Sequence, residues 1–298
     1  MIIDSHVHYA HTRYNAEFPY LGIDDATSAY TVRRADRDGM LADLKRHGIC
    51  GFIEAGIRFD GIEHQREVVA AHADCMWNAI GVHPTRCHLT AFFRRAALAA
   101  YADTTEHRPV AIGEAGLDYH QPRQKQHRLK QKRWFIYQIK LAHRLELPLI
   151  LHIRDAHRDA LRILRRYRRL LHGGVVHCFR GDAALAAEYV ALGFVIGIGG
   201  KLMGDPADAC LLQDTVAHLP LSAFVVETDA PYVLPLLPDL DCSNKQWRKL
   251  CNSSLILPAV IRRMAEIRGD DPRLVEDTVL ANTVRVFRLP AEGGTFHV

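Results

Sequence analysis

The sequence predicts a single-domain (β/α)8 barrel, and three observations support this fold class. Short apolar runs alternate with longer segments of helical periodicity along the 298 residues, and such alternation implies parallel strands joined by helices. There are eight apolar runs, which is the number of strands in a closed parallel barrel. The length lies in the range that such barrels occupy as one domain, and no linker, internal repeat or low-complexity tract divides the chain.

Eight segments are predicted as strands because each is short, apolar and bounded by polar or turn-forming residues. In chain order they are 2–8, 49–55, 77–83, 109–114, 147–153, 174–179, 194–199 and 223–229. Between them the apolar residues recur with the period of an amphipathic helix. The predicted helices are 36–47, 62–73, 124–146, 155–171 and 182–192, and a helical pattern returns from about 254 to 287.

An open, doubly wound sheet is the alternative fold for the same alternation. Its phosphate-binding fingerprint is absent, because GIGGKLMG at 197–204 follows a strand but lacks the G-x-G-x-x-G spacing. Lys201 is followed by Leu202 rather than by Ser or Thr, so the segment is not a P-loop either. The closed barrel is therefore preferred.

Residues 9–35 do not fit the alternation. They carry five aromatic and three arginine residues, namely Tyr9, Tyr14, Phe18, Tyr20, Tyr30, Arg13, Arg33 and Arg34. A loop of this length is usually functional or disordered. Because it leaves the carboxyl end of a strand, where barrel enzymes have their active sites, one interpretation is a lid-like insertion. The other is a surface loop whose aromatic side chains pack it onto the barrel.

Composition places the chain among ordinary globular proteins. It has 48 % hydrophobic and 24 % charged residues, which excludes disorder, collagen and coiled coil. The net charge of +4 is mild, so bulk charge does not predict strong attraction to a polyanion. Histidine (18) and arginine (30, against 8 lysines) are abundant. Imidazoles suit metal ions and guanidinium groups suit phosphates, but biased codon usage also explains both surpluses, so their positions must decide.

The seven cysteines predict neither a disulfide framework nor a thiolate zinc site. They are odd in number and scattered, without any C-x-x-C pair. A reducing, cytoplasmic location is therefore expected. The sequence shows no signal-peptide pattern and no apolar run long enough to span a membrane, so no membrane association is expected, and no protein partner can be inferred.

Residues that can bind metal gather near the carboxyl ends of the predicted strands. They are His6, His8, Glu114, His152, His177 and Asp229. In a parallel barrel these ends meet at one mouth. A single histidine near a strand end is more often hydrogen-bonded or exposed than a ligand. Six potential ligands at the same end of the barrel are a far less probable coincidence, and they predict a metal site.

Alternation along the strands adds detail to this site. It places His6 and His8 on the same face of the first strand, where both can bind one ion. By the same rule each remaining strand ligand caps apolar residues that point into the barrel: Glu114 above Val110 and Ile112, His152 above Ile150, and His177 above Val175. Four imidazoles and two carboxylates exceed the needs of one tetrahedral ion, so we expect two divalent ions (Zn²⁺, Mn²⁺ or Mg²⁺) bridged by Glu114.

Six short motifs carry a resemblance to a known family. They are DSHVH (4–8), GVHP (81–84), GEAGLDY (113–119), LHIRDA (151–156), HCFRG (177–181) and ETDAPY (227–232). Their order and approximate spacing resemble the TatD family of metal-dependent deoxyribonucleases, within the amidohydrolase superfamily, over most of the chain. The resemblance implies a (β/α)8 barrel with a two-metal site, and the family's ligand motifs fall on the same six residues.

The sequence also departs from the family pattern. Residues 9–35 are longer than the corresponding loop in most members and resemble an insertion that reshapes the substrate groove. The family often has an Arg-Asn-Glu-Pro-like stretch where this chain has Cys251 to Ser254, and a small residue where it has Arg180. These differences leave the predicted ligands intact but weaken the inference of a polynucleotide substrate.

Four residues are assigned roles in the chemistry. Asp229 is the candidate general base, and Glu114 acts as the bridging ligand. Arg154 lies two residues after His152 and so on the same face, where a guanidinium suits a substrate phosphate. An ion pair with a neighbouring carboxylate is the alternative for Arg154. His83 is predicted to hydrogen-bond the substrate or leaving group, with a structural cap before Pro84 as its alternative.

Three further residues are assigned places around the ligands. Asp4 and Glu227 each precede a ligand by two residues and are predicted to accept hydrogen bonds from imidazole N–H groups. Cys178 should point away from the metals, towards the helices, and is given no catalytic role.

Three functions remain open at this point. The first is a metal-dependent phosphodiesterase that acts on DNA, with the family resemblance implying a 3′-exonuclease. The second is a metal-dependent hydrolase of a small ester, lactone or amide on the same barrel. The third is a nucleic-acid-binding protein with a structural metal, which would use the arginine-rich segment 158–169. The phosphodiesterase is the preferred hypothesis.

Overall fold

The computed structural model describes residues 1–25, 27, 29–104, 108–204, 206–235, 237, 240 and 242–290. Eight parallel strands form one sheet, in the order β1 (Ile2–Val7), β4 (Ile49–Ala55), β5 (Met76–Ile80), β6 (Ala111–Asp118), β7 (Leu149–Arg154), β8 (Gly174–His177), β9 (Phe194–Ile198) and β10 (Phe224–Val226). The sheet closes because β1 meets the segment after β10: His8 N donates to Ala230 O at 2.8 Å, and Asp229 N donates to His6 O at 3.0 Å. The predicted (β/α)8 class is confirmed.

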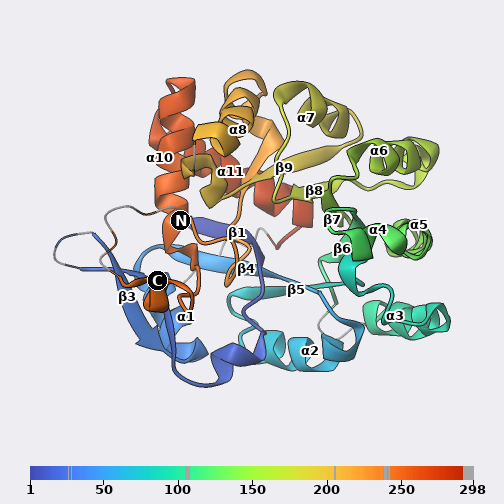
Figure 1. Ribbon diagram of the computed structural model, residues 1–298, viewed down its shortest axis with the longest axis horizontal. Helices are drawn as coiled ribbons and strands as arrows, with labels where there is room; N and C mark the ends of the chain where they lie inside the picture. The colour runs from blue at the N-terminus through green and yellow to red at the C-terminus, as the bar shows by residue number, and fades with distance from the viewer. Residues whose placement is uncertain are drawn as a thin grey trace.

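Helices surround the strands, as Figure 1 shows. They are α1 (Arg37–Arg46), α2 (Ile62–Ala71), α3 (Arg95–Ala102), α4 (Pro122–Gln126), α5 (Arg128–Leu145), α6 (His157–Arg166), α7 (Ala183–Val190), α8 (Pro206–His218), α9 (Asn244–Trp247), α10 (Leu257–Arg268) and α11 (Pro272–Phe287). Short 3₁₀ turns lie at Thr12–Asn15, Phe59–Gly61, Pro84–Arg86, Phe92–Arg94, Arg168–Leu170, Gly200–Met203, Leu221–Ala223 and Ser254–Ile256. Among the residues described, no helix combines the length and apolarity needed to cross a membrane.

The helices differ from the sequence prediction in two ways. The pattern from about 254 to 287 is two helices, because α10 ends at Gly269, which has a left-handed backbone (φ 69°). The Asp271 carboxylate then caps α11 by accepting a hydrogen bond from Arg273 N at 2.8 Å. The second difference is that α3, α8 and the four-residue α9 were not predicted. The apolar residues of α8 are not confined to one face, so this helix has no clear amphipathic period.

The barrel interior is filled by small and β-branched side chains from every strand. They are Ile3, Ile53, Ala55, Ala79, Ala111, Ile150, Val175, Val195 and Val225. Phe287 and Leu289, from the end of α11 and just beyond, pack against this cluster. Because Glu276 of α11 also pairs with the amino group of Met1, α11 lies at the amino end of the strands. The carboxyl ends form the open mouth.

Two strands break the alternation that the sequence analysis assumed. In β6 it is Ala111 that belongs to the interior cluster, whereas Ile112 packs in the larger cluster outside the strands. The predicted column of Val110, Ile112 and Glu114 is therefore wrong. The pairing of β6 with β7 shifts register between Ile112 and Ala115, and this irregularity returns Glu114 to the interior. A similar shift in β1 lies between Asp4 and Val7.

Residues 9–35 contain a β-hairpin rather than an irregular loop. Strands β2 (Phe18–Ile23) and β3 (Tyr30–Ala35) pair antiparallel, and the hairpin lies beside α1 in Figure 1. Strand β2 also bonds to the segment before α10, since Leu21 N donates to Cys251 O at 2.9 Å and Cys251 N donates to Pro19 O at 3.0 Å. The aromatic residues Tyr9, Tyr14, Phe18 and Tyr20 are all buried, as expected for side chains that pack the segment onto the barrel. A role as a lid stays a prediction.

Candidate metal centre

The structure brings all six predicted ligands together at the mouth of the barrel. His6, His8, Glu114 and His177 are at most 3 % exposed. The side chains of His152 and Asp229 are 17 % exposed and form the open side of the cluster. His6 lies in β1 and His8 directly after it, and the others come from β6, β7, β8 and the segment after β10. Residues far apart in sequence therefore converge because the strand ends do.

Glu114 lies between two groups of imidazoles. Its Oε1 is 3.6 Å from His6 Nε2 and 3.5 Å from His8 Nε2. Its Oε2 is 3.2 Å from His152 Nδ1, 3.3 Å from His177 Nε2 and 3.5 Å from His83 Nε2. Each oxygen of one carboxylate therefore faces a different set of nitrogens.

The first group consists of His6, His8 and Asp229. The Nε2 atoms of the two histidines are 3.3 Å apart, and Asp229 Oδ1 lies 3.1 Å from His8 Nε2 and 3.8 Å from His6 Nε2. His8 Nδ1 is 3.0 Å from Ala55 O. Because a carbonyl oxygen only accepts, His8 Nδ1 must carry a proton. In its neutral form His8 therefore directs the lone pair of Nε2 at the centre of the cluster.

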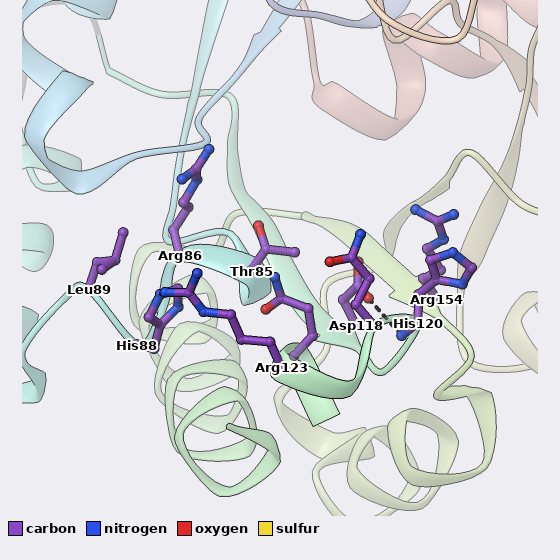
Figure 2. A pocket seen from close by; sticks show the side chains of 10 residues that line it. Thr85, Arg86, His88, Leu89, Asp118, His120, Arg123 and Arg154 are labelled. Carbon is purple, nitrogen blue, oxygen red and sulfur yellow. Dashed lines mark hydrogen bonds between the residues drawn. The ribbon is translucent and has the colours of Figure 1, made fainter. Parts of the chain in front are cut away.

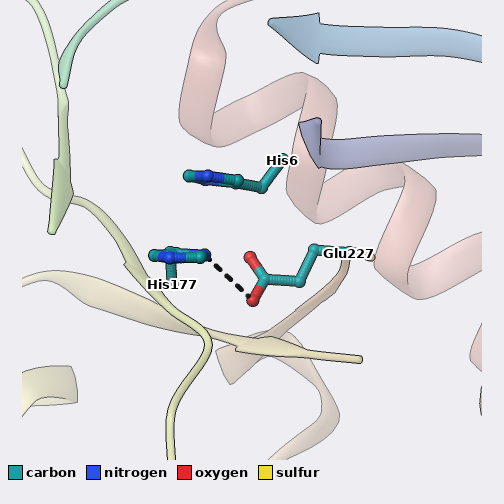
Figure 3. Close-up of side chains that lie close together, drawn as sticks. All are labelled: His6, His177 and Glu227. Atoms are coloured by element: carbon teal, nitrogen blue, oxygen red, sulfur yellow. Dashed lines mark ion pairs between the residues drawn. The ribbon is translucent and has the colours of Figure 1, made fainter. Parts of the chain in front are cut away.

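The second group contains His152 and His177. His152 Nε2 lies 3.1 Å from Asp118 Oδ2, which leaves Nδ1 facing Glu114. His177 Nδ1 lies within ion-pair distance of Glu227 Oε1, at 3.4 Å. The predicted hydrogen bond is not formed, because His177 Nδ1 has no hydrogen-bond partner among the described residues. Figure 3 shows His177 lying flat against His6, with ring centroids 3.7 Å apart, and Glu227 at its edge. These contacts fix which nitrogen of each ring faces the centre.

His83 joins the second group as a hydrogen-bond donor. Its Nδ1 accepts from Thr85 N at 3.1 Å, so in the neutral ring the proton is on Nε2. That Nε2 lies 3.1 Å from His152 Nδ1 and 3.5 Å from Glu114 Oε2. Burial lowers the pKa of His83 to about 3, which keeps the ring neutral. The side chain therefore presents an N–H group to the centre.

The donor set fits a divalent cation. The Nε2 atoms of His6 and His8 are 3.3 Å apart, and two carboxylates lie beside them. Together these atoms can accept more hydrogen bonds than the protons on the two rings can supply. The buried atoms His6 Nδ1 and Glu227 Oε2 have no hydrogen-bond partner among the described residues. Three triads of side chains lie close enough together to hold an ion: His6, His8 and Glu114; His83, Glu114 and His152; and His6, His177 and Glu227. In the second triad His83 faces the centre with its N–H, which leaves Glu114 and His152 as the ligands. Imidazole and carboxylate ligands of this kind suit zinc, manganese and related cations.

The cluster also perturbs the acidity of its members. Burial alone would lower the pKa of His8, but the hydrogen bond to Asp229 and the charge of Glu114 raise it to about 9. The pKa of His152 is raised in the same way, to about 9, because its interactions with Asp118 and Glu114 outweigh the effect of burial. For Glu114 burial would raise the pKa, but the surrounding imidazoles of His83, His6 and His177 hold it well below the usual range. The carboxylate is therefore ionised at neutral pH.

One prediction about a neighbouring side chain is wrong, and a second relied on regular strand geometry that the backbone does not keep. Asp4 does not accept from an imidazole; its Oδ2 accepts hydrogen bonds from Thr228 Oγ1 at 2.6 Å and Ser254 Oγ at 2.7 Å. The register shift that follows Asp4 in β1 places it and His6 on different sides of the strand. Cys178 lines a cavity that is bounded both by Asp229 and by Leu185 and Leu211 of the helices, so the direction of its side chain stays a prediction. Its left-handed backbone (φ 47°), directly after β8, breaks the alternation on which the prediction relied.

Two residues near the centre were not singled out from the sequence. Asp118 holds His152, and the ring of Tyr232, which is 40 % exposed, stands with its centroid 5.7 Å from that of His8. Both lie inside the quoted motifs GEAGLDY and ETDAPY, so the signal was present. Arg154 lines two cavities at the mouth, and no carboxylate of the described residues lies within ion-pair distance of it.

Comparison with known proteins identifies the family. The model of a family described as TatD related DNase matches residues 3–288. The chain belongs to this family. A 3′-5′ ssDNA/RNA exonuclease TatD from Cronobacter sakazakii is 34 % identical over 252 residues, which cover 85 % of this chain and 92 % of that protein. The protein of the same name from Pectobacterium carotovorum is 33 % identical over 256 residues, covering 85 % and 94 %. The TatD family consists of metal-dependent hydrolases, and the resemblance seen in the motifs is confirmed.

Solved structures of TatD proteins share the fold. The crystal structure of a TatD homologue from Escherichia coli superposes with a TM-score of 0.78 at 24 % identity, covering 97 % of this chain and 98 % of that one. A TatD family hydrolase from Entamoeba histolytica gives a TM-score of 0.77 at 20 % identity, covering 96 % and 97 %. The small-ester alternative is not favoured, because the family and the curated relatives are named as nucleases.

Proposed function

We propose that this TatD-family chain hydrolyses phosphodiester bonds in single-stranded DNA or RNA and removes nucleotides from the 3′ end. The observation that carries the proposal is the position of Glu114, whose two oxygens face separate groups of imidazoles. The relatives named as 3′-5′ ssDNA/RNA exonucleases support the choice of substrate and direction.

The residues present suit two divalent ions, Zn²⁺, Mn²⁺ or Mg²⁺, with Glu114 between them. We assign His6, His8 and Asp229 to one ion, and His152 and His177 to the other. Divalent cations in such a site polarise a phosphoryl oxygen and make a neighbouring water more acidic. The protein residues then have to bind the substrate phosphate, accept a proton and assist the leaving group.

Asp229 is the carboxylate best placed to accept a proton. Its side chain is 17 % exposed, against 2 % for Glu114, and it lines a cavity of about 430 Å³ together with His177 and Arg154. Burial alone would raise the pKa of Asp229, but the hydrogen bond with His8 and the nearby imidazoles lower it. Asp229 is thus ionised at neutral pH and open to the cavity, as a general base must be.

Arg154 and His83 are assigned to the substrate. The Arg154 guanidinium stands at the cavity wall beside His152 and His177, where it can bind two oxygens of one phosphate. His83 presents its Nε2–H to the centre and can donate a hydrogen bond to a phosphoryl or leaving-group oxygen.

The test is cleavage of short oligonucleotides by the purified protein loaded in turn with Mg²⁺, Mn²⁺ and Zn²⁺. With a label at the 5′ end, single-stranded DNA or RNA should shorten stepwise from the 3′ end, and a phosphorothioate at the last linkage should slow the reaction. Absence of cleavage with all three cations, or cuts only inside the strand, would contradict the proposal.

A cytoplasmic location is kept as part of the proposal. None of the seven cysteines, all of which lie in described residues, takes part in a disulfide, which suits a reducing compartment.

A further inference from the structure

A second cavity opens beside the metal centre, between the loop after β5 and the carboxyl ends of β6 and β7. Its volume is about 490 Å³, which exceeds the needs of one phosphate group and lies within the range of small-molecule sites. Figure 2 shows Arg86 and Arg123 on one side of the cavity and Arg154 on the other, with Thr85 and Asp118 between them. Three arginine side chains therefore line one cavity.

The cavity adjoins the metal centre through two residues. Asp118, in its wall, contacts His152 Nε2 through Oδ2 at 3.1 Å, so a single side chain separates the cavity from a proposed metal ligand. Arg154 lines this cavity and also the one that contains His177 and Asp229. A molecule with one phosphate at the metal centre can therefore extend into the arginine-lined cavity without leaving the mouth.

The charges in the cavity are not neutralised by the protein. No carboxylate of the described residues lies within ion-pair distance of Arg86, Arg123 or Arg154, in contrast to Arg33, whose Nη1 lies 2.5 Å from Asp43 Oδ1. Asp118 is the acidic residue in the cavity wall, and both of its oxygens are engaged: Oδ2 with His152, and Oδ1 with the backbone N of His120 at 3.0 Å. The cavity is therefore positive and suited to an anion.

One of the arginines is also held in place. Arg123 Nη2 lies 3.3 Å from His88 Nε2, and the His88 ring stacks on His127 with centroids 4.8 Å apart. A guanidinium that is supported on one side loses less freedom when it binds a ligand on the other. Phosphate accepts hydrogen bonds from two guanidinium nitrogens at once. An arginine without a carboxylate partner has these nitrogens available for a phosphate.

We propose that the cavity lined by Arg86 and Arg123 binds a backbone phosphate of a single-stranded polynucleotide, next to the phosphate that is cleaved. The inference rests on the proposed function and deepens it, because it specifies that the substrate has at least two phosphates. Arg154, between the two cavities, contacts both phosphates or the sugar that joins them. The enzyme should accordingly discriminate between a polynucleotide and a diester with one phosphate.

The test compares two substrates in the Arg86→Gln/Arg123→Gln variant. One is a short single-stranded oligonucleotide, and the other is bis(4-nitrophenyl) phosphate, which has one phosphate. We expect kcat/KM for the oligonucleotide to fall about 10- to 100-fold, mainly through KM, because two charge-assisted contacts are lost. Hydrolysis of the small diester should stay within about twofold. The matched control is Arg273→Gln/Arg285→Gln, which removes the same charge from α11 at the opposite end of the barrel.

Binding without turnover gives a second readout. In EDTA, the affinity for a labelled oligonucleotide is measured by fluorescence anisotropy against salt concentration. Each neutralised phosphate contributes about 0.7 to the logarithmic salt slope of a single strand, so loss of the one phosphate in this cavity should reduce the slope by about 0.7 in the cavity variant and leave it unchanged in the control.

The outcomes separate this inference from the proposed function. Unchanged oligonucleotide binding and cleavage in the cavity variant, or equal losses on both substrates, would overturn the inference while the parent enzyme remains a nuclease. If the parent cleaves neither substrate, the proposed function fails, and the anisotropy slope still decides whether the cavity binds backbone phosphate.

Discussion

The floor and the wall of the barrel mouth have opposite electrostatic characters. The floor is the metal centre, where Glu114 and Asp229 lie among imidazoles that are almost completely buried. Its nitrogen and oxygen atoms can accept more hydrogen bonds than their own protons can supply. In the wall, Arg86, Arg123 and Arg154 surround an open cavity without a carboxylate partner among the described residues. A site with surplus acceptors attracts cations, and a site with surplus donors attracts anions. The two regions together suit a metal-dependent reaction on a polyanion.

The largest expected effect comes from the floor. Glu114→Gln keeps the size of the side chain but removes the charge shared by both imidazole groups, so turnover of an oligonucleotide should fall by roughly 1000-fold or more. Bound divalent metal, measured by elemental analysis after dialysis, should also decrease. Glu67→Gln, at an exposed position of α2, is the control. A variant that retains both its bound metal and its activity would show that Glu114 is not a metal ligand.

The two regions should also respond differently to pH. Without a cation His8 and His152, with pKa values of about 9, carry a proton at neutral pH, and each must release it to bind a metal. Metal affinity should therefore fall as the pH drops below about 9, by up to roughly 100-fold per pH unit if two protons are released. Guanidinium groups stay charged throughout this range, so binding of the oligonucleotide in EDTA should change far less.

Calorimetry checks this difference directly. Titration of metal into the protein at one pH, in two buffers of different ionisation enthalpy, gives the number of protons released. A count near zero at neutral pH would contradict the assignment of His8 and His152 as protonated ligands.

Asp118 connects the two regions and should have an intermediate effect. Asp118→Asn weakens the contact that orients His152, and changes of this kind typically lower metal affinity or activity by about 10- to 100-fold. Because a carboxylate is also removed from the arginine-lined wall, oligonucleotide binding in EDTA should not weaken. If metal affinity were unchanged and DNA binding were lost instead, Asp118 would belong to the wall alone.

The smallest expected effect is that of Tyr232, at the edge of the floor. Its exposed ring stands near His8 and offers a surface on which a terminal base can stack. Tyr232→Leu should weaken oligonucleotide binding by about 1 kcal/mol, roughly fivefold. Tyr232→Phe, which keeps the ring, should bind like the parent, and equal losses in both variants would exclude stacking as the cause.

The residues of the floor could be predicted from the sequence because their position depends only on the order of strands and helices. Strand carboxyl ends meet at one mouth in any parallel barrel, so His152 and His177 could be placed together without coordinates. Prediction failed where the backbone leaves regular geometry. No residue type marks the register shifts in β1 and β6, so Asp4 and Ile112 were assigned to the wrong face. Of the wall, Arg154 was singled out from the sequence, but Arg86 and Arg123 were not, because they follow no strand period and lie in a 3₁₀ turn and in the short helix α4.

The contacts of Asp4 bear on how the molecule reaches its folded state. Its carboxylate binds Thr228 and Ser254, which lie 224 and 250 positions further along the chain, and β2 bonds to Cys251 in the same region. Contacts of such sequence separation form slowly, since a long loop must close first. The first strand should therefore lack these contacts until Ser254, which lies in the last fifth of the polypeptide, has left the ribosome. A nascent chain arrested while Ser254 is still inside the ribosome should be digested by protease from its amino end, and a chain long enough to expose α10 outside the ribosome should resist.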